Sequence, residues 1–97
     1  MFDNLLDLDD RGMQELLRNV QSDQLLLALK GADEGMKEKI FKNMSQRAGE
    51  TLKEDLEAKG PVRVSEVENA QKEILKIARK LAESGAISLG GKGDQYV

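Results

Sequence analysis

Apolar residues recur three or four positions apart along most of the chain, which is the spacing of one helical face. Five such stretches cover about residues 10–20, 23–30, 34–43, 46–59 and 66–84. A residue able to cap a first helical turn precedes each stretch: Asp9 or Asp10, Ser22, Asp33, Ser45 and Ser65. The connections are only a few residues long, so consecutive helices must turn sharply and pack on each other. The pattern therefore predicts an all-α protein.

The second stretch is expected to be the central helix. Leu25, Leu26, Leu27 and Leu29 place leucine nearly all round it, and a helix that is apolar on every side belongs inside a domain. The last stretch is the longest and has one apolar and one charged arc. The expected fold is a compact bundle of about five to six short helices, with the last long helix wrapping the Leu-rich central one.

The two ends of the chain have a different composition from the helical part. Residues 1–8 form a short apolar lead-in, and the helical domain is expected over residues 9–89. Residues 87–89 suit a short extended segment. Residues 90–97 begin GGKG and are expected to form a flexible tail, because glycine costs the most conformational entropy to order.

The fourth stretch carries the candidate functional surface. Ala48, Leu52 and Leu56 recur every four residues and predict a narrow inward seam. At about 100° per residue, Arg47 and Glu54 lie on the side of the helix opposite the seam, and Asp55 lies on the flank of that outward side. This charged ridge is either a solvated helix face or a contact surface for a partner. Gly49, inside the same helix, marks either a close approach of a neighbouring helix or a hinge.

Composition excludes several kinds of site. The chain has no cysteine and no histidine, so disulfides, Cys- or His-ligated metal sites and nucleophile–His catalysis are excluded. A net charge of −3 does not fit a non-specific nucleic-acid binder. No apolar run approaches the roughly 18 residues that span a bilayer, and residues 1–10 lack the basic region of a signal peptide. The glycines of residues 90–93 precede no helix, so they do not form a phosphate-binding loop. We therefore expect no enzyme, no cofactor and no metal.

Two stretches carry more specific information. Residues 39–68, KIFKNMSQRAGETLKEDLEAKGPVRVSEVE, resemble the C-terminal domain of FliG, the flagellar motor switch protein. LLDLDDRGMQELLRNV near the start and the closing GDQYV resemble the same family, so the similarity covers nearly the whole chain. The family's domain is a compact six-helix unit that follows armadillo-like domains and a Met-Phe-X-Phe hinge. By this resemblance, residues 1–8 are the remnant of the interdomain hinge, with Met1 and Phe2 as the tail of its motif, and the chain is an excised domain.

The resemblance also implies a function. In the family this domain is the rotor surface that meets the cytoplasmic loop of the stator, where torque passes, and it takes part in switching the direction of rotation. The charged positions implicated in the family correspond here to Lys30, Arg47, Glu54, Asp55 and Arg63. The implied location is the flagellar basal body, peripheral to the cytoplasmic face of the inner membrane. Other implied partners are switch-complex proteins and the membrane ring, reached through domains outside this sequence. The alternative is a helical assembly module whose charged face is only solvated.

Overall fold

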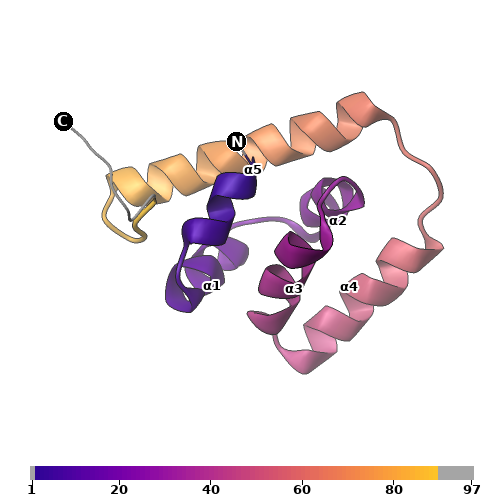
Figure 1. Ribbon diagram of the computed structural model, residues 1–97, viewed down its shortest axis with the longest axis horizontal. Coiled ribbons are helices and arrows are strands. Elements are labelled where there is room, and N and C mark those ends of the chain that lie inside the picture. The colour runs from indigo at the N-terminus through magenta and orange to yellow at the C-terminus, as the bar shows by residue number, and fades with distance from the viewer. Residues whose placement is uncertain (1, 90–97) are drawn as a thin grey trace.

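The computed structural model describes residues 2–89, which fold into six helical elements with no strand among them (Figure 1). In chain order they are the 3₁₀ helix η1 (Phe2–Asp7) and the α-helices α1 (Asp10–Arg18), α2 (Ser22–Lys30), α3 (Glu34–Lys42), α4 (Gln46–Ala58) and α5 (Val64–Glu83). The all-α prediction is confirmed.

Helix α2 is the centre of the packing. It lies under one half of α5, which runs along one side of the molecule, and it also contacts α4 (Figure 1). Leu25, Ala28 and Leu29 of α2 are buried against Ala70, Ile74 and Ala78 of α5 and other core residues. Gln71 Nε2 of α5 donates a hydrogen bond to the Ala28 carbonyl oxygen at 3.0 Å. The long helix therefore lies across the Leu-rich one, as the apolar arcs predict.

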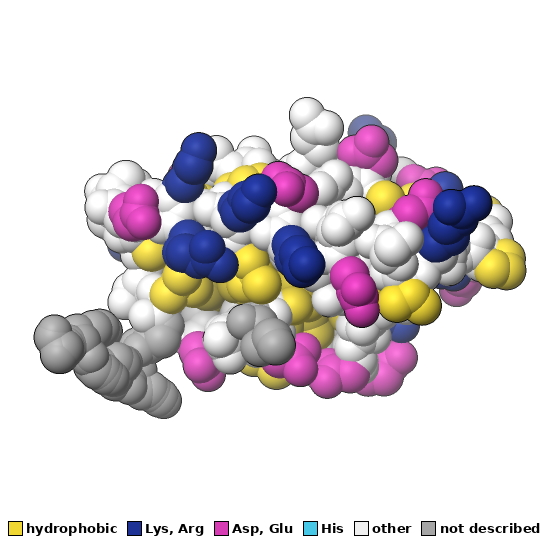
Figure 2. All heavy atoms as spheres, turned by 90° about the horizontal axis from the view of Figure 1, so that it is seen from above, with side chains coloured by type: hydrophobic (Ala, Val, Ile, Leu, Met, Phe, Trp, Pro, Cys, Tyr) yellow, Lys and Arg dark blue, Asp and Glu magenta, His cyan; other side chains and the backbone are white. Residues whose placement is uncertain are grey.

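The outer face of α5 is charged along its whole length. Glu66 lies in its first turn and Lys80 in its last, so acids precede bases as the helix dipole favours. Figure 2 looks down on this face and shows Lys and Arg side chains gathered over the C-terminal half of the helix. Acidic side chains lie among them, so the face does not carry one sign of charge.

The sixth helical element is η1, which falls in the segment that the sequence indicates only as a lead-in. Phe2, Leu5 and Leu8 are buried in the core, and η1 packs on α3 and α5. Leu6 is the apolar residue of η1 that stays at the surface, with 40% of its area exposed. Residues 2–8 thus belong to the packed body, and their origin in an interdomain hinge stays a prediction.

Three of the predicted helix caps are confirmed. The side chains of Asp9, Asp33 and Ser45 accept hydrogen bonds from backbone N–H groups three residues ahead, at 2.7, 2.9 and 3.2 Å. Each of these side chains satisfies one of the free donors of a first helical turn.

Two helix starts differ from the prediction. Helix α2 begins at Ser22, so Gln21 is its N-cap and Ser22 is already helical. Helix α5 begins at Val64, and the prediction that Ser65 caps it is wrong. Glu66, rather than Glu68, reaches back, accepting a hydrogen bond from the Arg63 N–H at 3.1 Å. Since either pair has the spacing of a capping box, the sequence alone offers two registers.

The segment after α5 folds back onto the core. Gly85 has φ = 88°, and the Ala86 N–H donates to the Leu81 carbonyl, which is the closure of a Schellman motif. Ile87 is 7% exposed and packs in the core, so residues 87–89 form a bend that buries one side chain rather than an extended strand. The predicted tail, residues 90–97, lies outside the described residues.

Candidate partner-binding surface on helix α4

Helix α4 is held to the body by a narrow seam. Gly49 and Leu52 are buried and Leu56 is half-buried, whereas Ala48 is exposed. The prediction that Ala48 belongs to the seam is therefore wrong, because the seam is rotated by one position and runs through Gly49. A Cβ at Gly49 would lie 4.0 Å from the Phe41 carbonyl oxygen, an ordinary contact, so close approach of α3 does not require glycine there.

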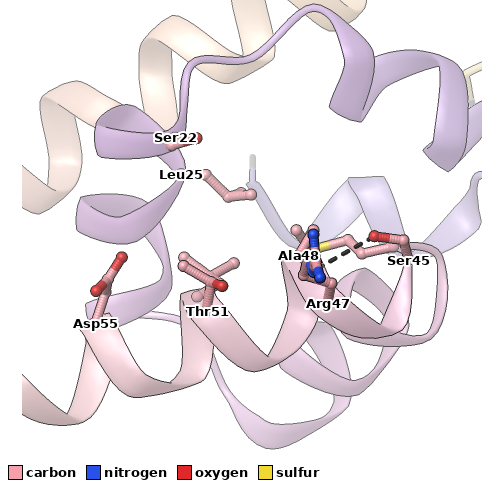
Figure 3. A pocket seen from close by; sticks show the side chains of 9 residues that line it. Ser22, Leu25, Ser45, Arg47, Ala48, Thr51 and Asp55 are labelled. Carbon is pink, nitrogen blue, oxygen red and sulfur yellow. Dashed lines mark hydrogen bonds between the residues drawn. The ribbon is translucent and has the colours of Figure 1, made fainter.

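The exposed side of this seam borders a groove between α2 and α4. The groove encloses about 340 Å³. Figure 3 shows Leu25 and Ser22 of α2 on one wall, with Ala48, Thr51 and Asp55 of α4 on the other. The complete lining is Ser22, Leu25, Met44, Ser45, Arg47, Ala48, Thr51, Leu52 and Asp55. The floor is therefore mainly apolar, and the charges stand on the α4 wall.

Arg47 and Asp55 are the predicted site residues that share this groove. Both are exposed, and Thr51 lies midway between them along α4. Glu54 is also exposed, but it precedes Asp55, points about 100° away from it around the helix axis, and belongs to the outer face of the helix. The ion pairs found among residues 2–89 involve none of these three charges. The structure thus separates the predicted ridge into a groove wall and an outer face.

The other two predicted site residues, Lys30 and Arg63, lie near the C-terminal end of α4. Lys30, at the end of α2, is half-buried, and its Nζ donates to the Lys59 carbonyl oxygen at 3.2 Å. Lys59 is the C-cap residue of α4, so this ammonium group stabilises the negative end of that helix. Arg63 is exposed and is the N-cap residue of α5. Both therefore flank the connection between α4 and α5.

That connection also has an apolar surface that the charge pattern does not indicate. Val64 is 70% exposed, and together with Pro61, Val62 and Val67 it borders a hollow beside Lys30. In the sequence, this apolar surface is indicated by the short run from Pro61 to Val64, where apolar residues outnumber polar ones at the start of a helix.

A separate charged cluster joins α1 to α3. Asp10 Oδ1 accepts a hydrogen bond from Asn43 Nδ2 at 3.2 Å and lies 3.7 Å from Lys42 Nζ. The hydrogen bond from Asn43, with the positive charges of Lys42 and Lys39, lowers the pKa of Asp10 from its ordinary value. This cluster connects α1 to α3, and its residues Lys42 and Asn43 directly precede Met44 and Ser45 of the groove lining.

Comparison with known proteins identifies the family to which the chain belongs. A family description, the FliG C-terminal domain, matches residues 1–89. The chain belongs to the FliG C-terminal domain family. Flagellar motor switch protein FliG of Pseudomonas aeruginosa is 72% identical over 95 residues, which cover 98% of this chain and 28% of that protein. The FliG of Vibrio cholerae is 58% identical over 97 residues, covering all of this chain and 28% of that protein.

Solved FliG structures have the same fold. A crystal structure of FliG residues 116–343 from H. pylori matches with a TM-score of 0.89 and 34% identity, over 92% of this chain and 39% of that one. Full-length FliG from Aquifex aeolicus matches with a TM-score of 0.84 and 43% identity, over 87% of this chain and 26% of that one. The chain thus spans less than a third of the curated FliG proteins that it matches.

The groove is the part of the site that charge reasoning missed. Arg47, Thr51 and Asp55 recur every four residues, so they share one flank of α4, and this spacing was available in the sequence. What the sequence could not provide is the position of Leu25 across the gap, since that depends on how α2 and α4 pack.

Within residues 2–89, no helix is both long and apolar enough to cross a membrane.

Proposed function

We propose that this chain is the stator-facing domain of a flagellar rotor protein, and that the charges of α4 contact the cytoplasmic loop of the stator to transmit torque. Arg47, Glu54 and Asp55 would make the direct contacts, with Lys30 and Arg63 at the end of the same surface. The domain would work at the cytoplasmic face of the inner membrane, as a peripheral part of the basal body. Direction switching would belong to the assembly in which it sits.

The observation that supports this function best is that the charges of Arg47 and Asp55 are accessible to a partner. Both charges are exposed on one flank of α4, and neither takes part in the ion pairs found among residues 2–89. A partner carrying the opposite charges can therefore engage them without first breaking an internal pair. Membership of the FliG family supports the choice of partner.

The strength of such contacts suits a motor. An exposed ion pair contributes only about 0–1 kcal/mol, and salt screens it beyond about 8 Å at physiological ionic strength. A stator must engage and release each rotor subunit many times, so individually weak contacts with fast association are required. A surface with both signs of charge attracts one part of the stator loop and repels another, which gives the contact a direction.

Lys30 would differ from the other four residues in its contribution. Its Nζ is 3.2 Å from the Lys59 carbonyl oxygen, so part of its hydrogen-bonding capacity is used inside the domain. Replacing it would alter the end of α4 as well as the surface charge. A motility defect at Lys30 is therefore weaker support for a stator contact than one at Arg47.

The test is a double charge reversal, Arg47→Asp with Asp55→Arg, made in the full-length protein and assayed by swimming and by motor torque. The pair keeps the net charge, and the matched control is Arg79→Asp with Glu83→Arg on the exposed face of α5. We expect loss of motility for the α4 pair, near-normal motility for the α5 pair, and recovery when the opposing stator charges are reversed. Neutralising a single α4 charge should weaken motility only mildly.

Normal motility of the α4 double reversal, with normal protein levels, would contradict the proposal. The domain would then be an assembly module with a solvated charged face. That alternative also predicts that Leu26→Asp, a change in half-buried α2 packing, abolishes motility by unfolding the domain while every reversal on α4 is tolerated.

A further inference from the structure

We infer that the groove between α2 and α4 takes an apolar side chain of the stator loop, which is held between the two charges of the α4 wall. This inference rests on the proposed function and names a second, non-electrostatic part of the same contact. The occupant is a segment of the stator loop that carries an acid, an apolar residue and a base in turn. Arg47 faces its acid, Asp55 faces its base, and the groove takes the apolar residue.

The groove has the shape and lining for such a side chain. Its volume of about 340 Å³ lies at the small end of the range of ligand pockets, about 300–1,000 Å³, and suits one or two side chains. Leu25 and Leu52 form a buried apolar base, while Ala48 and Thr51 are exposed above it. Alanine at position 48 keeps the opening wide, since its side chain is a single methyl group.

Ala48 is apolar but uncovered in residues 2–89. The α4 seam, Gly49, Leu52 and Leu56, is turned toward the body, whereas Ala48 lies beside the seam, borders the groove and stays accessible. A neighbouring charge on each side of an open apolar site is the arrangement of a protein interface, in which an apolar centre is surrounded by a polar rim.

Charge complementarity identifies the occupant. Arg47 and Asp55 are eight residues apart, which places them about 12 Å apart along the helix, with Thr51 midway. A partner segment with one acid and one base at matching separation must pass directly over Thr51 and the groove. A side chain between its two charges that points at Leu25 meets a mainly apolar lining, which favours an apolar residue there over a polar one.

The apolar contact supplies what the charges cannot. Coulomb attraction is long-ranged and only weakly dependent on exact position, so it steers the two surfaces together without fixing their register. Burial of an apolar group is short-ranged, and each CH₂ removed from water is worth about fourfold in affinity. The groove therefore sets where along α4 the stator loop comes to rest at each step.

Filling the groove tests the inference while all charges are kept. Ala48→Met in the full-length protein places a flexible apolar side chain in the opening, and Ala58→Met makes the same change at an exposed position of α4 outside the lining. We expect Ala48→Met to lose most of the motor torque at high load and Ala58→Met to retain it. Shortening the apolar residue of the stator loop to alanine should restore torque to Ala48→Met.

A disulfide trap provides a direct measurement of proximity. These 97 residues contain no cysteine, so Ala48→Cys introduces a defined thiol, and Ala58→Cys is the matched control. Oxidation in cells carrying a cysteine at the apolar position of the stator loop should cross-link Ala48→Cys and leave Ala58→Cys free. Equal torque for the two methionine variants, or equal cross-linking of the two cysteine variants, overturns the inference.

The two proposals fail in different ways. If the Arg47 and Asp55 double reversal stops motility but the groove-filling variant rotates normally, the charge contact stands and the apolar anchor is wrong. If the double reversal leaves motility normal, the stator contact itself is wrong, and the groove cannot be its centre.

Discussion

Gly31 is predicted to be required by helix packing. It ends α2 with φ = −110°, which alanine also adopts, so its backbone does not demand glycine. An added Cβ, however, would lie 2.6 Å from Val67 Cγ1 and 3.4 Å from Gln71 Nε2, both on α5. Valine is stiff at χ1, and Gln71 is held by its hydrogen bond to the Ala28 carbonyl oxygen. Gly31→Ala must therefore push α5 away from α2.

The size of the effect follows from two opposing terms. Replacing glycine with alanine stabilises by about 0.4–1 kcal/mol through the unfolded chain, whereas overpacking a well-packed contact costs about 1–3 kcal/mol. The midpoints of these two ranges give a net loss of about 1.3 kcal/mol in the free energy of unfolding. For a domain of this size that lowers Tm by roughly 5–10 °C.

Thermal unfolding of the 97-residue chain, followed by circular dichroism, measures this shift. Gly49→Ala is the matched control, because its Cβ meets only an ordinary contact at 4.0 Å, and it should raise Tm. Val67→Ala removes the clashing methyl group, so the double variant of Gly31 and Val67 should lose less stability than the two single variants together. A higher Tm for Gly31→Ala, or strict additivity with Val67→Ala, would refute the reasoning.

Two further predictions concern hydrogen bonds between helices. Lys30→Met removes the donor to the Lys59 carbonyl oxygen but keeps the apolar stem of the side chain. We expect the free energy of unfolding, measured by chemical denaturation, to fall by about 0.5–1.5 kcal/mol. An unchanged denaturation midpoint would show that this hydrogen bond does not stabilise the domain. Asn43→Ala should raise the pKa of Asp10 in an NMR titration, because the hydrogen bond is the largest cause of its lowering. The pKa of Asp10 is lower in the folded state than in the unfolded state. The stabilisation by its ionised carboxylate is therefore present above the unfolded pKa and is lost as the pH falls through the folded pKa. Asn43→Ala should weaken this dependence of stability on acid pH.

The sequence predicted the elements whose signals are local. Asp9, Asp33 and Ser45 are caps because a short polar side chain before an apolar period needs only its own first turn to form the bond. The core face of α5 followed from its period for the same reason. The predicted start of α5 was wrong because Ser65 and Arg63 each have a glutamate three residues ahead, and the helix uses the pair of Arg63 and Glu66.

The errors at the candidate site have a different cause. Ala48 and Gly49 are both small, so the pattern could not decide which of them faces inward, and burial chose Gly49. The helical period predicted that Arg47, Glu54 and Asp55 face outward, and all three are exposed. Their role as contact residues came from the resemblance and stays a prediction. Their division between a groove wall and an outer face required the position of α2, which no local pattern contains.

The thin seam of α4 has a consequence for the motions of the domain. α5 buries Ala70, Ile74 and Ala78 along α2, whereas α4 buries only Gly49 and Leu52 and packs chiefly on α2. The free energy of local opening scales with the apolar contacts that must be broken, so α4 separates from the body more readily than α5 does. The helix that carries the proposed stator-contact charges is thus the compliant one, and a load applied to it strains α4 before it disturbs the core.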